Sequence, residues 1–159
     1  TTAPAPSRVA LGGRWGGGCG SPGVWGLGRD LARPTRRRVQ AIGAGGFHFS
    51  SPDSVYAVAQ QYQIPILTVV LDNGGWQAVK SAVQRVYPKG IAAETDQFQS
   101  RLTSGRQGER RDFSDVAKAF GAYGECVTEP DELAAAIDRA VAALDDGKAA
   151  VLHIRGTRR

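Results

Sequence analysis

Several features that would place the chain in a membrane or outside the cell are missing from this sequence. No run approaches the roughly 20 consecutive apolar residues of a membrane-spanning helix, and the first residues carry no apolar secretory signal. Only two cysteines occur, Cys19 and Cys126, and neither belongs to a CxxC or Cys/His cluster, so the sequence indicates no disulfide framework and no zinc site. These absences argue against a membrane or exported protein and predict a cytoplasmic one.

Methionine is also absent, even at position 1, which predicts a fragment of a longer product or a processed chain. The 159 residues, 42% of them hydrophobic and 22% charged, match one ordinary globular domain. We expect a flexible N-terminal segment over residues 1–15, a single domain over residues 16–155 and a basic tail over residues 156–159.

The net charge of +5 is distributed unevenly along the chain. Residues 1–43 hold seven arginines and one aspartate, whereas residues 44–159 hold 13 basic and 14 acidic residues. A basic run of this kind can mark a nucleic-acid surface. Here it has few interleaved aromatic residues and no recognised binding motif, so solvated arginines are the simpler interpretation and we expect no nucleic-acid partner.

From residue 39 onward, apolar runs with strand character alternate with segments of helical periodicity. The predicted strands cover residues 39–42, 64–71, 125–128 and 150–154, and the predicted helices begin at Ser51, Trp76, Asp112 and Glu129. The run at 64–71 is almost continuously apolar, as expected for a central parallel strand. The sequence therefore predicts an α/β fold with a doubly wound, mostly parallel sheet and helices on both faces.

Two predicted turns carry residues suited to a ligand. Gly43-Ala44-Gly45-Gly46 follows the first strand and could present backbone N–H groups to a phosphate. Asp72-Asn73-Gly74-Gly75 follows the most apolar strand and supplies oxygen ligands for a hard divalent cation. Because ligands of open parallel sheets bind beyond the carboxyl ends of the strands, the two turns together suggest a diphosphate bridged by magnesium.

A nicotinamide-binding oxidoreductase is the first alternative, because Gly43-x-Gly45 begins a G-x-G-x-x-G pattern. His48 stands where the third glycine belongs, and no acidic residue lies about 20 positions further on. This alternative is disfavoured.

The two turns together resemble the signature of thiamine diphosphate enzymes, which is G-D-G followed by N-N at the end of a strand. Here 26 residues separate Gly45 from Asp72, in agreement with that spacing. Further similarity lies in Gly17-Gly18-x-Gly20, Leu31-Ala32-Arg33-Pro34, Asp112-Phe113 and Pro130-x-Glu132-Leu133. From about Gly16 to Ile154 the chain is similar to the C-terminal domain of acetolactate synthase-like and benzoylformate decarboxylase-like enzymes, and the resemblance implies the thiamine diphosphate-binding fold.

The resemblance implies a set of cofactor-binding positions. Those for thiamine diphosphate are Ala44, Gly45, Gly46, Asn73 and Gly75, and those for Mg²⁺ are Asn73, Gly75 and Asp72. Ala44 stands where the family has an aspartate ligand, and Asp72 stands where the first asparagine is usual. A methyl group cannot replace an anionic ligand, so we expect weak or absent metal and cofactor binding.

The resemblance also implies partners for the whole enzyme. These are a 2-oxo acid substrate, a pyrimidine-binding domain of the same or another subunit that carries the activating glutamate, and further copies of the chain in a homo-oligomer. That domain is not in this sequence, so we assign no catalytic residue and expect the isolated chain to be inactive. A non-catalytic remnant with the same fold is a second alternative. Trp76, His48 and His153 are interpreted as structural residues.

Overall fold

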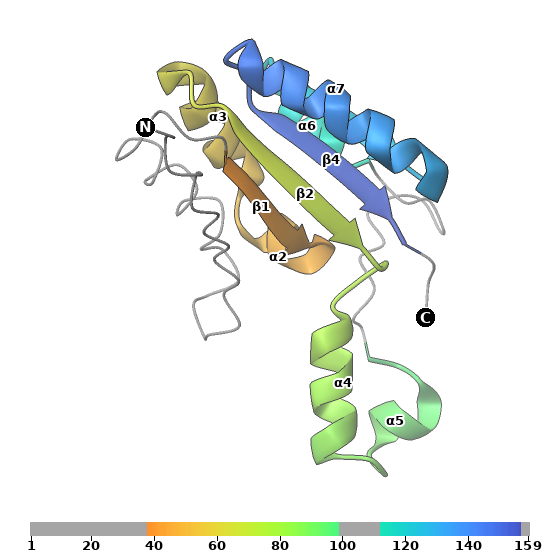
Figure 1. Cartoon of the computed structure of the whole chain (residues 1–159). Coiled ribbons are helices and arrows are strands. Elements are labelled where there is room, and N and C mark those ends of the chain that lie inside the picture. Colours follow the sequence, from red (N-terminus) through yellow and green to blue (C-terminus); the bar gives the residue numbers. More distant parts are fainter. Residues whose placement is uncertain (1–37, 99–111, 157–159) are drawn as a thin grey trace, which may run out of the picture.

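Four parallel strands form the centre of the computed structural model, which describes residues 38–98 and 112–156 (Figure 1). The strands are β1 (Arg38–Gly43), β2 (Ile66–Asp72), β3 (Tyr123–Val127) and β4 (Ala150–Arg155). Their order in the sheet is β1-β2-β4-β3, and each neighbouring pair is parallel. The apolar run at 64–71 thus supplies an interior strand, which confirms the prediction. β2 begins only after Pro65, because proline has no N–H for the ladder.

Helices cover both faces of this sheet, which confirms the predicted doubly wound arrangement. On one face lie α2 (Ala44–Phe49), α3 (Pro52–Tyr62) and α6 (Ser114–Ala119) (Figure 1). On the other lies α7 (Leu133–Asp145), which follows a short 3₁₀ turn, η1 (Pro130–Glu132). Two further helices, α4 (Gln77–Val86) and α5 (Ile91–Thr95), project away from the sheet (Figure 1). No helix among the described residues has the length and apolar composition needed to cross a bilayer.

Each face of the sheet has its own apolar cluster. Val70 and Val151 pack with Tyr56 of α3 and Ala117 of α6 on the first face. Successive residues of a strand point to opposite faces of the sheet. The strand residues that alternate with Val70 and Val151 therefore point to the face on which α7 lies. This second cluster consists of Leu67, Val127, Ala136, Ala140, Leu144, Ala150 and Leu152.

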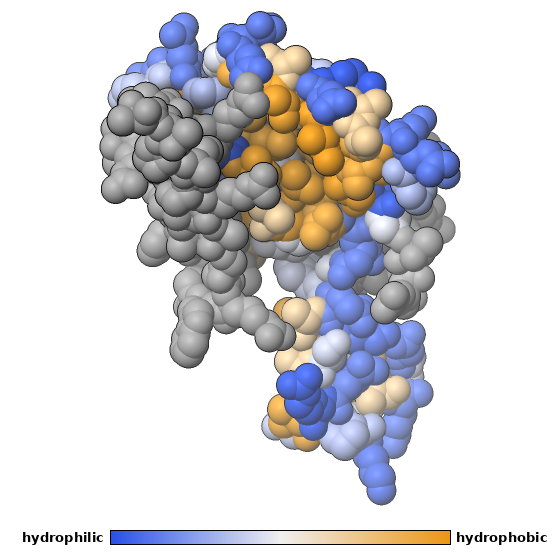
Figure 2. Space-filling model, in the orientation of Figure 1, coloured by the Kyte–Doolittle hydropathy of each residue, from blue (hydrophilic) through white to orange (hydrophobic). Residues whose placement is uncertain are grey.

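The face covered by α7 is open over β1 and the end of β2. Val39 remains 65% exposed and Leu71 52% exposed. Figure 2 shows apolar side chains gathered in this region, beside the atoms of α7. Among the described helices α7 alone lies on this face, and it contacts β2, β3 and β4.

One segment differs from its predicted form. The glycine-rich segment after β1 forms the first turn of α2, whose N-cap is Gly43, rather than a separate turn. The helix predicted to begin at Trp76 is α4, in which Val79 and Val86 are 54% and 66% exposed. Helix α5 begins after Gly90, whose backbone is extended. The predictions that concern residues 1–37, including Cys19 and the upstream glycines, and residues 99–111 lie outside the described residues.

Gly124 in β3 marks a close approach of α6 to the sheet. A Cβ at this position would lie 2.4 Å from the backbone oxygen of Ser114, well inside van der Waals contact. Only a residue without a side chain therefore allows β3 and the start of α6 to lie this close together.

We expect Gly124→Ala to lower the free energy of unfolding by about 1–3 kcal/mol, because backbone atoms must shift to admit the methyl group. Urea unfolding followed by circular dichroism measures the change. Gly43→Ala is the matched control, since nothing lies within 4 Å of the place that its Cβ would occupy and its φ of −73° suits alanine. The control should remain within about 0.5 kcal/mol of the original chain, and equal losses in both variants would contradict the close-approach explanation.

Candidate functional site

The two turns singled out in the sequence lie side by side at the carboxyl edge of the sheet. β1 and β2 pair in parallel up to Gly43 and Leu71, so Ala44 and Asp72 follow directly after the last paired residues. The indole of Trp76 packs on Gly45, where a Cβ would lie 2.4 Å from the indole ring. The structure thus brings both predicted turns to one place, as the parallel pairing requires.

The predicted site residues differ in their accessibility. Ala44 is 1% exposed, and Gly45 is also buried in the first turn of α2. Asn73 is exposed, and its Oδ1 accepts the Gly75 N–H at 3.3 Å. Gly75 and Gly46 are half-buried. The predicted positions therefore include both buried and exposed residues. The indole of Trp76 fills the space that a side chain at position 45 would occupy.

Asp72 points inward rather than toward the turns. It is 4% exposed, its Oδ1 accepts the Gly74 N–H at 2.7 Å, and its Oδ2 lies 3.1 Å from Nε2 of His153. Both carboxylate oxygens are therefore engaged within the protein. A buried carboxylate requires such partners, because its desolvation is otherwise very unfavourable.

His153 in β4 is fully buried and lies between two carboxylates. Its Nδ1 accepts the backbone N–H of Phe113 at 3.2 Å, so in the neutral ring Nε2 carries the hydrogen and donates it to Asp72. The Oδ1 atom of Asp112 lies 3.1 Å from the same Nδ1. The interpretation of His153 as a structural histidine agrees with this burial. His48 differs, since it is exposed on α2 and meets the ring of Trp76 edge-on.

Asp112 stands just before α6, near the predicted start of that helix. The N-cap residue of α6 is Phe113, one residue after Asp112. The Asp112 carboxylate still satisfies a backbone donor at the start of the helix, because its Oδ1 accepts the Ser114 N–H at 2.9 Å. Burial acts to raise the pKa of this carboxyl, but hydrogen bonds from Ser114 and the neighbouring His153 outweigh it, so the pKa lies below its ordinary value. Asp112 is therefore ionised at neutral pH.

Sequence reasoning did not identify this network as a group of interacting residues. A signal was present, because Asp72 and His153 both stand near the carboxyl ends of predicted strands. Recognising it required the strand order, which places β4 beside β2 and so brings His153 to Asp72.

The residues at the ends of β1 and β2 do not fit a tightly held magnesium–diphosphate group. Magnesium prefers oxygen ligands in near-octahedral geometry and is bound through one or two carboxylates. Ala44 supplies a methyl group, and both oxygens of Asp72 are engaged by Gly74 and His153. The ligands left at the predicted positions are the neutral oxygens of Asn73 and Gly75.

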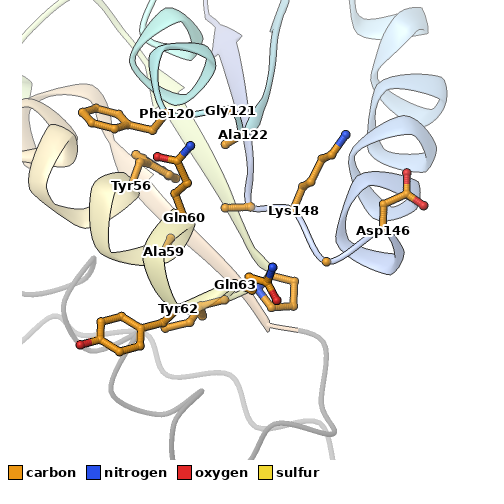
Figure 3. A pocket seen from close by; sticks show the side chains of 14 residues that line it. Tyr56, Ala59, Gln60, Tyr62, Gln63, Phe120, Gly121, Ala122, Asp146 and Lys148 are labelled. Carbon is orange, nitrogen blue, oxygen red and sulfur yellow. The ribbon is translucent and has the colours of Figure 1, made fainter.

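A hollow of about 710 Å³ lies at the opposite edge of the sheet, near the amino ends of the strands (Figure 3). Its walls come from the end of α3, the turn after α6 and the turn between α7 and β4. Gln60, Tyr62, Asp146 and Lys148 lie around it, and all four are exposed. Because these polar groups face solvent at the far end of the strands from Asp72, the hollow is not part of the candidate site.

We expect His153→Leu to lower the free energy of unfolding by about 3–5 kcal/mol, since it leaves the buried Asp72 carboxylate without its imidazole partner. Adding Asp72→Asn to this variant should restore part of the loss, and thermal unfolding of the two single variants and the double variant measures the coupling. His48→Leu, at an exposed position, is the control. If His153→Leu cost no more than His48→Leu, the buried pair would have no structural role.

Comparisons with known proteins agree with the fold. The family model described as "Thiamine pyrophosphate enzyme, C-terminal TPP binding domain" matches residues 4–154. The acetolactate synthase large subunit IlvG of Mycobacterium tuberculosis is 32% identical over 138 residues, which are 86% of this chain and 22% of that protein. A sulfoacetaldehyde acetyltransferase of Alcaligenes xylosoxydans xylosoxydans is 29% identical over 143 residues, covering 89% of this chain and 21% of that protein.

Solved structures show the same fold. The thiamine diphosphate-dependent 4-hydroxybenzoylformate decarboxylase of Rhodococcus jostii RHA1 superposes with a TM-score of 0.66 at 21% identity, over 84% of this chain and 22% of that chain. The chain thus spans about a fifth of the length of the relatives it matches. Together with the family match over residues 4–154, this shows that the chain belongs to the C-terminal thiamine pyrophosphate-binding domains of thiamine pyrophosphate enzymes.

Proposed function

We propose that this chain supplies the diphosphate-binding half of the active site in an acetolactate synthase-like or 2-oxo acid decarboxylase-like enzyme, a lyase or transferase. Thiamine diphosphate is the cofactor that this family of domains binds. The bond-breaking chemistry belongs to that cofactor when it is bound, while the protein supplies orientation and electrostatics. Support comes from the family match and from the two adjacent turns at the carboxyl edge of the sheet.

The proposed cofactor-binding positions are Ala44, Gly45, Gly46, Asn73 and Gly75, with Asn73, Gly75 and Asp72 as the positions nearest a magnesium ion. One observation determines what they can do: Ala44 is buried directly beside the end of β2, where it offers no oxygen. We therefore infer that this chain holds magnesium and the cofactor weakly by itself.

The proposed partners follow from the length of the relatives. Because the chain spans about a fifth of those proteins, a pyrimidine-binding domain, from the same or another subunit, would complete the site. The proposed substrate class is a 2-oxo acid, and the proposed assembly is a homo-oligomer in the cytoplasm. No residue of this chain is assigned a catalytic role.

A second candidate function is that of a non-catalytic remnant or interaction domain. Two observations favour it: Ala44 has no ligand atom, and the Asp72 carboxylate is held by Gly74 and His153. A nicotinamide-dependent oxidoreductase has no comparable support, because the family match is to a thiamine pyrophosphate domain.

Calorimetric titration of the chain with Mg²⁺ and thiamine diphosphate separates the two candidates. We expect binding weaker than micromolar in the original chain and a gain of at least about tenfold in Ala44→Asp, which corresponds to about 1.4 kcal/mol. Ala44→Asn has nearly the same size without the charge and should gain less.

Circular dichroism establishes that each variant is folded. Micromolar binding by the original chain would contradict the inference of a weakened site. If Ala44→Asp is folded and binds no better than Ala44→Asn, the remnant is the correct function.

A further inference from the structure

A mixed cluster of a carboxylate, a thiol and an imidazole lies under the start of α6. Its members are Asp112, Cys126 and His153, and one ligand atom from each lies within 4.8 Å of the others. Cys126 and His153 are directly paired across β3 and β4, so both point to the face covered by α6. Asp112 enters from the segment that leads into that helix.

The contacts of His153 place two potential metal-ligand atoms next to one another in this cluster. The Phe113 N–H points at Nδ1, so Nδ1 presents its lone pair on this side, and the ionised Asp112 places Oδ1 only 3.1 Å away. Two acceptor atoms at hydrogen-bond distance repel one another unless a cation or a proton lies near both. A metal ion bound to both atoms satisfies this requirement and would replace the Phe113 hydrogen bond at Nδ1.

The ligand types select the class of metal. A thiolate with an imidazole and a carboxylate is typical of Zn²⁺ and of similar borderline transition metals, whereas Mg²⁺ and Ca²⁺ prefer oxygen ligands alone. Zinc bonds of about 2.0–2.3 Å at tetrahedral angles place ligand atoms about 3.5 Å apart. Atoms already within 4.8 Å of one another reach that separation through small side-chain movements.

The surroundings of His153 match those of a metal-binding histidine. Such a histidine usually donates its second ring N–H to a carboxylate, which fixes the orientation of the ring. Here Nε2 lies 3.1 Å from Oδ2 of Asp72, and the Gly74 N–H holds the other oxygen of that carboxylate. His153 is 0% exposed, while Asp112 and Cys126 are half-buried, so two of the three ligand residues keep some contact with solvent.

Lys118 is a cation near this cluster, and its charge interacts with both Asp112 and Cys126. Its ammonium group is paired with Asp115 on the surface of α6 at 2.8 Å. A nearby lysine favours the thiolate form of a cysteine, which is the form that binds metals. Two carboxylates, those of Asp72 and Asp112, also lie beside His153.

We propose that Asp112, Cys126 and His153 bind one Zn²⁺-class ion, with a water molecule as the fourth ligand and Asp72 positioning the histidine. Binding releases the proton of the Cys126 thiol to solvent. None of these three ligands is among the proposed cofactor positions, although Asp72, a proposed magnesium position, contacts His153. The thiolate band of the metal-loaded cluster is therefore read independently of thiamine diphosphate binding.

Cobalt(II) titration of the full chain tests this proposal, since a cobalt–thiolate bond gives a charge-transfer absorption band in the near ultraviolet. We expect one equivalent of Co²⁺ to produce the band and Zn²⁺ to displace it. Cys126→Ser should abolish the band, and Asp112→Asn should weaken binding by about tenfold or more. Cys19→Ser removes the other cysteine and is the matched control, which should retain the band.

Each result decides for or against the proposal. Circular dichroism shows that the variants are folded, and an excess of Mg²⁺ and thiamine diphosphate should leave the cobalt band unchanged. A folded original chain with no thiolate band, a band lost in Cys19→Ser, or a band retained in Cys126→Ser would overturn the proposal.

Discussion

The buried imidazole of His153 connects three parts of the fold that are distant in sequence. Through Nε2 it meets the carboxylate at the end of β2, and through Nδ1 it meets the backbone and the carboxylate at the start of α6. Charged groups with so little solvent contact are stable only when their partners are well placed. The relative positions of β2, β4 and α6 therefore depend on this one side chain, and so does the carboxyl edge of the sheet where the two turns lie.

The same network limits what the candidate cofactor site can do. Asp72 is the carboxylate nearest the two turns, and the interior of the protein uses both its oxygens. With alanine at position 44, the carboxyl edge of β1 offers no side-chain oxygen beside Asp72. The fold of this chain is that of a thiamine pyrophosphate domain, but a fold does not by itself determine which ligand a site can hold.

Periodicity predicted most of the described fold because it reflects burial directly. The continuous apolar run at 64–71 indicated an interior strand, and alanines at helical spacing indicated α7. Periodicity shows which residues share a face but not what covers that face, and in α4 Val79 and Val86 are exposed. The cofactor positions came from spacing and resemblance, whereas the contacts of His153 depend on strand order, which no local pattern encodes.

Trp76 and Gly45 lie in different segments of the chain, yet the indole of Trp76 fills the space that a side chain at position 45 would occupy. A larger residue at position 45 would overlap the indole, so the chain can accept one only after the tryptophan has been replaced by something smaller. The order of substitutions during the divergence of this domain is therefore constrained: position 76 has to change first, and among related sequences the sizes of these two residues should vary inversely.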